Sequence, residues 1–280
     1  MEWHSEYDSI IHIISKKDGK PHPLSTKVRT KGFISFHHSN AYEKDGHIVL
    51  DVTASWKQEN KDYTIERLRS KDMMKDWLCS NRETNMAARF CFPEKITSLT
   101  RKNVNLNKFG QATAKLRDDG TVWMVHENLF NTSELDWRKF VGPHGFEFCR
   151  INYENFNGRE HRYIWGNGFG TMIPDKILKV DTKTKQWKIW QEKGAYPSEP
   201  VFVNRPGSTD EQDGVILSIL IYSDGKRPIE LICLDPKDLK EIARAKSTVA
   251  SQPYAFHHSY LPIDFSKKTP QAPKGRLPIN

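Results

Sequence analysis

The chain has 280 residues, of which 37% are hydrophobic and 28% charged, a composition typical of a globular protein rather than a disordered one. Its first ten residues carry acidic side chains where a secretory signal needs an apolar run, and no stretch approaches the roughly 18 apolar residues of a membrane-spanning helix. The net charge of +8 comes from lysines scattered among acidic residues, so we predict no nucleic-acid partner. We therefore expect a cytoplasmic protein, and we leave peripheral contact with a membrane open.

Strand-like runs joined by tight polar turns recur along the chain. In order they are Ile10–Ser15 before Lys17-Asp18-Gly19, Ala41–Asp45 and His47–Ala54 on either side of Gly46, Ala112–Leu116 and Val122–Val125 around Asp118-Asp119-Gly120, and Val215–Tyr222 after Asp213-Gly214. An Asp-Gly pair supplies the positive φ that a tight hairpin turn needs. The sequence therefore predicts an all-β protein.

Three of the strand-like segments resemble one another, because each is an apolar run that ends in a polar turn. They are Ile11–Gly19, Ile177–Lys185 and Leu231–Asp238. Equivalent aspartates in the last two are about 54 positions apart, close to the roughly 40- to 50-residue repeat of propeller blades. Short strands would also suit a β-sandwich, but this spacing favours a β-propeller.

Two segments depart from this pattern. Residues 62–80 place apolar side chains at roughly helical spacing among charged ones, which predicts a small helical insertion that packs over the sheets. Residues 266–280 form a basic, Pro-rich tail that we expect to be disordered. We therefore predict one propeller domain over residues 1–265, followed by that tail. The four cysteines are too far apart for a zinc ribbon, and we assign them no chemistry.

Two of the eleven histidines follow strand-like apolar runs. His37 comes after residues 33–36 (Phe-Ile-Ser-Phe), and His257 comes after residues 254–256 (Tyr-Ala-Phe). A single histidine is more often a surface residue or a hydrogen-bonded core residue, but one that emerges from a buried strand can point a ring nitrogen into a metal site. Each is followed by a second histidine, and neighbours on a strand face opposite ways, so only one of each pair can enter the site. His37 and His257 are therefore the candidate metal ligands.

Five segments carry a resemblance to a known family. They are Phe36–Glu43, Phe146–Tyr153, Tyr196–Val203 with Arg205-Pro206-Gly207, Asp213–Ser218 and Pro253–His257. Together they resemble the carotenoid cleavage oxygenase family, and most closely its animal branch of β-carotene oxygenases and the retinoid isomerohydrolase. The resemblance extends from about residue 10 to about residue 263.

The resemblance implies a seven-bladed β-propeller capped by a dome of helices and loops, with a non-haem Fe(II) on its axis held by four histidines. By motif position, His37 is similar to the third ligand and His257 to the fourth. Glu147 and Glu199 are similar to the carboxylates that hold the ligand imidazoles in place. The resemblance implies no catalytic residue beyond the metal site and no cofactor other than Fe(2+). The implied reaction is cleavage of a carbon–carbon double bond of a carotenoid or apocarotenoid by O2 to two carbonyl products, as in retinal formation.

The sequence departs from the family pattern in two ways. The first two iron histidines of the family precede the matched region, and neither His4 nor His12 fits them. We therefore expect an open fragment, the C-terminal half of the propeller, with weak iron binding and little activity by itself. The family has Gly after its last histidine, where this chain has His258, which leaves open whether His257 or His258 faces the metal.

Two alternative functions also stay open. One is a retinyl ester isomerohydrolase of the same family, and the other is an inactive propeller fragment that serves as a binding module. The sequence predicts no oligomeric state.

Overall fold

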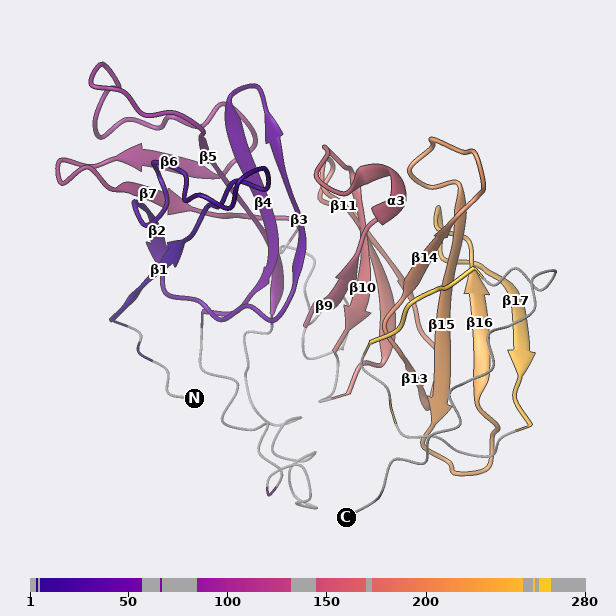
Figure 1. The fold of residues 1–280 in the computed structure, drawn as a ribbon. Coiled ribbons are helices and arrows are strands. Elements are labelled where there is room, and N and C mark those ends of the chain that lie inside the picture. The colour runs from indigo at the N-terminus through magenta and orange to yellow at the C-terminus, as the bar shows by residue number, and fades with distance from the viewer. Residues whose placement is uncertain are drawn as a thin grey trace, which may run out of the picture.

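The computed structural model describes residues 4, 6–56, 66, 85–131, 145–169, 173–248, 254 and 257–262. These residues form four β-sheets and a short helix, α3 (Tyr153–Phe156), so the predicted all-β class is confirmed (Figure 1). The helix predicted over residues 62–80 lies outside the described residues apart from Glu66, and the tail at 266–280 lies outside them entirely. Among the described residues, no helix is long and apolar enough to cross a membrane.

The chain crosses between the first and second sheets before it enters the third and then the fourth. The first sheet has the order β1 (Asp8–Ile11), β2 (Val28–Lys31), β7 (Val122–Val125), β6 (Thr113–Leu116), and the second β3 (His38–Lys44), β4 (His47–Ala54), β5 (Met86–Pro93), β8 (Glu127–Asn128). The third has the order β12 (Trp187–Trp190), β11 (Lys176–Asp181), β10 (Tyr163–Gly168), β9 (Glu147–Arg150). The fourth has the order β13 (Ala195–Pro197), β15 (Gly214–Tyr222), β16 (Glu230–Leu234), β17 (Glu241–Lys246), and β14 (Val201–Asn204) also pairs with β15. Pairing is antiparallel except between β2 and β7.

The turn signals in the sequence explain the tightest hairpin. Asp45 and Gly46 join β3 to β4 with φ values of 45° and 73°, the left-handed pair that a two-residue hairpin turn requires. The Asp-Gly prediction was wrong at Gly214, which is the first residue of β15, pairs with Asn204 and is not among the glycines with positive φ. A Cβ at Gly214 would lie 2.3 Å from the carbonyl oxygen of Val203, so the glycine is needed there for close approach of two strands rather than for a turn.

The hydrophobic core is divided into layers between successive sheets. One buried cluster joins the first sheet to the second, a second cluster joins the second sheet to the third, and a third joins the third sheet to the fourth. Strand β10 shows how this works, since Ile164 packs into the second cluster while its neighbour Trp165 packs into the third. Both faces of the inner sheets are therefore buried, as in the blades of a propeller. A complete seven-bladed arrangement stays a prediction.

The two halves of the described chain meet where β3 and β9 lie in contact (Figure 1). His37 directly precedes β3, and Glu147 is the first residue of β9. The sheet stacking thus brings together two motifs that are far apart in the sequence.

Candidate metal centre

The structure brings the two candidate histidines together. The ring centroids of His37 and His257 are 5.2 Å apart, although 219 residues separate them in the chain. The backbone of His37 is fixed on β4, because Thr53 donates its N–H to the carbonyl oxygen of His37 at 2.9 Å and accepts the N–H of His37 on Oγ1 at 3.3 Å. The side chain of His257 is 62% exposed and that of His37 is 23% exposed, so the site opens to solvent on the side of His257.

Glu147 is the partner of His37. Its buried carboxylate lies 2.6 Å, Oε2 to Nδ1, from the imidazole. Thr53 Oγ1 donates to the same oxygen at 2.9 Å, and Asn85 Nδ2 donates to Oε1. An ionised carboxylate accepts hydrogen bonds but cannot donate one. In its contact with Glu147, His37 must therefore be the donor, with its proton on Nδ1. Nε2 is then the nitrogen that can act as a ligand.

Glu199 occupies the corresponding place beside His257. It lies between β13 and β14, it is 3% exposed, and its Oε2 is 3.4 Å from Nδ1 of His257. The same oxygen accepts the backbone N–H of His258 at 2.9 Å, and Oε1 accepts Nε–H of Arg150 at 2.9 Å. Both of the carboxylates that the sequence motifs singled out therefore face Nδ1 of a candidate histidine.

An irregularity in β9 aims its side chains at this centre. Arg150 pairs with Trp165 and Glu147 with Asn167, so three steps on β9 match two on β10. The extra residue is a β-bulge, and Phe148 within it has a φ of 51°, which is unusual for a bulky residue. The ring centroid of Phe148 lies 4.8 Å from that of His37 and 5.4 Å from that of His257.

The donor set fits a metal ion in its chemistry. Nδ1 of each imidazole faces a buried carboxylate, at 2.6 Å for His37 and 3.4 Å for His257, as in sites where a carboxylate orients a histidine whose Nε2 binds a metal. Within the described residues, Nε2 of His37 and Nε2 of His257 have no hydrogen-bond partner. No group of three or more His, Cys, Asp or Glu side chains converges as a metal site among these residues, so the pair supplies two ligand positions.

Sequence reasoning missed four residues that support this pair. They are Thr53, Asn85, Phe148 and Arg150. Phe148 and Arg150 belong to a segment that carries the family resemblance, but nothing in their residue types indicates a left-handed backbone or a contact with Glu199. Thr53 and Asn85 lie in no motif, and only the fold brings them to Glu147.

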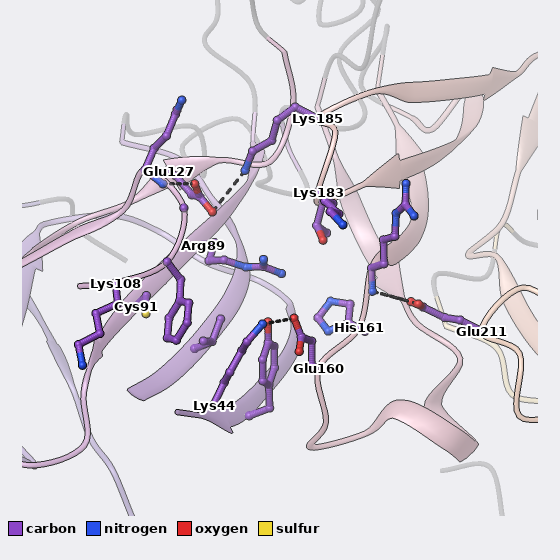
Figure 2. A pocket seen from close by; sticks show the side chains of 17 residues that line it. Lys44, Arg89, Cys91, Lys108, Glu127, Glu160, His161, Lys183, Lys185 and Glu211 are labelled. Carbon is purple, nitrogen blue, oxygen red and sulfur yellow. Dashed lines mark hydrogen bonds and ion pairs between the residues drawn. The ribbon is translucent and has the colours of Figure 1, made fainter. Parts of the chain in front are cut away.

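A separate cavity of about 790 Å³ lies between the second and third sheets (Figure 2). Its lining is rich in charge, and ion pairs from Lys44 to Glu160 and from Lys185 to Glu127 join the two sheets across it. A hydrocarbon such as a carotenoid needs an apolar surface. The cavity therefore does not match the predicted substrate, and its ion pairs tie neighbouring sheets together.

None of the described thiols, those of Cys91, Cys149 and Cys233, belongs to a group of three or more side chains that could hold a metal ion. Burial raises the pKa of Cys91 and that of Cys149 to about 12, so both remain protonated thiols near neutral pH. A metal-binding or nucleophilic cysteine needs the opposite shift.

Comparisons with known proteins give a consistent result. The model of the family described as retinal pigment epithelial membrane protein matches residues 1–262. The mitochondrial carotenoid-cleaving dioxygenase of Macaca fascicularis is 33% identical over 269 residues, covering 94% of this chain and 46% of the relative. The Homo sapiens protein of the same description is 32% identical over 269 residues, with 94% and 44% covered. This chain thus spans about half the length of the curated relatives it matches.

Solved structures share the fold. Cobalt-substituted Synechocystis ACO superposes with a TM-score of 0.61 at 22% identity, over 88% of this chain and 43% of the other. A variant of Synechocystis apocarotenoid oxygenase gives a TM-score of 0.64 at 22% identity, over 92% of this chain and 45% of the other.

Proposed function

Since this chain belongs to the retinal pigment epithelial membrane protein family, which is the carotenoid oxygenase family that its motifs resemble, we propose that it is part of an Fe(II)-dependent oxygenase. The proposed reaction is cleavage of a carbon–carbon double bond of a carotenoid or apocarotenoid by O2 to two carbonyl products. The observation that carries the proposal is the pair of imidazoles 5.2 Å apart, each with a buried carboxylate facing its Nδ1. The relatives named as carotenoid-cleaving dioxygenases support the substrate class.

The residues of this chain would hold the metal and tune it. His37 and His257 would bind through Nε2, while Glu147 and Glu199 keep a proton on Nδ1 and fix the direction of each ring. Neutral imidazole suits Fe(II), and the bound metal would supply the one-electron chemistry through which O2 reacts. Phe148 stacks on Phe169, with ring centroids 6.0 Å apart, and this apolar pair screens one side of the histidines from water.

The metal site is tested by titrating the metal-free chain with Co(II), which has a visible absorption band. Replacing His37 or His257 with Asn is expected to lower Co(II) affinity by at least about tenfold, since each change removes a ligand rather than a supporting contact. His12→Asn, at an exposed position, is the matched control and should leave the affinity unchanged. Equal affinities for all three variants would refute the site.

The reaction is tested in a full-length chimera, in which residues 1–262 of this chain replace the matching region of the Homo sapiens dioxygenase. With Fe(II), air and β-carotene or an apocarotenoid, chromatography should show aldehyde products, and the His257→Asn chimera should form none. An iron-loaded chimera that forms no aldehyde while the parent enzyme does would contradict the proposal. Conversion of an all-trans retinyl ester to a cis retinol without O2 uptake would instead identify an isomerohydrolase.

A further inference from the structure

We propose that Arg150 is a positioning residue that holds the C-terminal segment so that His257, rather than His258, faces the metal. The inference deepens the proposed function and rests on its metal site. It also answers the question that the doubled histidine leaves open in the sequence.

The guanidinium of Arg150 makes two hydrogen bonds in different directions. Nε donates to Oε1 of Glu199 at 2.9 Å, and Nη2 donates to the backbone carbonyl oxygen of His258 at 2.9 Å. Glu199 in turn accepts the backbone N–H of His258 on Oε2 at 2.9 Å. Both backbone polar groups of His258 are thus tied to one Arg–Glu pair, which fixes where this residue sits and how its backbone is rotated.

Fixing His258 in this way determines the position of its neighbour. The oxygen of Glu199 that accepts the N–H of His258 is also the one 3.4 Å from Nδ1 of His257. Turning the backbone so that the ring of His258 faces His37 would break at least one of the two ties, because the N–H and the C=O of His258 are both engaged. The two ties therefore favour the backbone rotation in which the ring of His257 lies against that of His37.

Arginine suits this task better than lysine does. Its planar guanidinium presents several N–H groups in a rigid fork, whereas a lysine ammonium is a point charge on a flexible chain. A lysine could keep the attraction to Glu199 but could not also reach the His258 carbonyl in a fixed direction.

Because of its bulge, β9 positions both histidines. Glu147 and Arg150 are three residues apart, so in a regular strand they would face opposite sides. The extra residue marked by Phe148 changes this, because Glu147 and Arg150 pair with Asn167 and Trp165, which are only two residues apart on β10. Glu147 then reaches His37 directly, and Arg150 reaches His257 through Glu199.

The first test needs no metal. In the 280-residue chain labelled with ¹⁵N, long-range ¹H–¹⁵N correlations report which ring nitrogen of His257 carries the proton, and the His257→Asn spectrum assigns the signal. The wild type should show the Nδ1–H form, facing Glu199. Arg150→Gln should shift His257 toward the mixture of two tautomers that a histidine adopts in water. The tautomer of His37 should not change, and Arg150→Lys should give a tautomer ratio between those of the wild type and Arg150→Gln.

The second test asks which histidine binds the metal. In the wild-type background, His257→Asn should lower Co(II) affinity by at least about tenfold, and His258→Asn should have little effect. In the Arg150→Gln background the difference between these two substitutions should largely disappear. Arg205→Gln is the matched control, since it breaks an exposed Arg–Asp contact of 2.7 Å between Arg205 and Asp213 that involves neither histidine, and both readouts should stay as in the wild type.

The outcomes separate this inference from the proposed function. An unchanged His257 tautomer in Arg150→Gln, or an unchanged contrast between the His257 and His258 substitutions, overturns the role of Arg150. If Arg150→Gln shifts the tautomer of His257, but neither His257→Asn nor His258→Asn changes the affinity for Co(II), the positioning role of Arg150 is upheld and the metal site is refuted. If Arg150→Gln does not fold, Arg150→Lys is read against the same criteria.

Discussion

Replacing Asp51 with Asn is expected to lower the free energy of unfolding by about 3 to 5 kcal/mol, since it removes one partner of a buried ion pair and leaves the other without compensation. Asp51 is fully buried on β4. Arg89 on β5 donates Nε–H and Nη2–H to its two oxygens, both at 2.7 Å. In the variant, the amide offers one acceptor where the carboxylate offered two, and Arg89 keeps its charge.

The effect should extend beyond one sheet. Nε2 of His161, just before β10, lies 3.2 Å from Oδ2 of Asp51, and Nδ1 of His161 lies 3.1 Å from Nδ2 of Asn40 on β3. The Asp51 carboxylate on the second sheet therefore contacts His161, which leads into the third sheet and lines the charged cavity (Figure 2). Urea unfolding measured by circular dichroism gives the loss. Asp213→Asn, at a partly exposed position, removes the partner of Arg205; it is the control and should cause no measurable change. A similar midpoint for both variants would contradict the assignment.

Acid unfolding offers a second measure of how much the Asp51 carboxylate stabilises the fold. Burial raises the pKa of Asp51, but the charge and hydrogen bonds of Arg89, together with His161, outweigh burial and bring the pKa to about 2. Because this value lies below the ordinary 3.8, the stabilisation is complete above about pH 4 and is lost as the pH falls toward 2. The Asp51→Asn variant should show a shallower fall of unfolding free energy over this interval.

Local sequence signals predicted the strands because their causes are local. The Asp45-Gly46 hairpin needs only two residues that tolerate positive φ, and those residue types are visible in the sequence. The same pair of residue types failed at Gly214, where the glycine is needed for close approach of Val203. A dipeptide cannot show which neighbouring strand the fold will bring against it.

The centre of the site depended on resemblance rather than on pattern. His37 and His257 were candidates because they follow apolar runs, but Glu147 and Glu199 were matched to them only through family motifs. The left-handed Phe148 could not be foreseen, because phenylalanine disfavours that backbone conformation and tertiary packing must hold it there. The burial of Asp51 arises in the same way, from the stacking of two sheets around a charged residue within β4.

Replacing Glu147 with Gln is expected to weaken metal binding by about 10- to 100-fold, the usual cost of losing a carboxylate that orients a ligand histidine. All three partners of Glu147 are placed to donate: Asn85 to Oε1, and Thr53 and His37 to Oε2. An ionised carboxylate has acceptor sites for all of them, but a glutamine amide must turn its NH2 group toward at least one donor. The substitution keeps the size of the side chain, so the effect comes from hydrogen bonding rather than from a cavity.

The orientation of the amide determines what happens to His37. Asn85 could accept only by turning its whole amide over, whereas an imidazole can move its proton from Nδ1 to Nε2 without moving its ring. The variant should therefore place its oxygen toward Asn85 and its NH2 toward His37, which protonates Nε2 and blocks the nitrogen proposed to bind the metal. Co(II) titration gives the affinity, and ¹⁵N spectra give the tautomer of His37. Glu43→Gln, at an exposed position on β3, should change neither. If Glu147→Gln keeps the Nδ1–H form of His37 and the wild-type affinity, Glu147 is not what holds this imidazole in its ligand form.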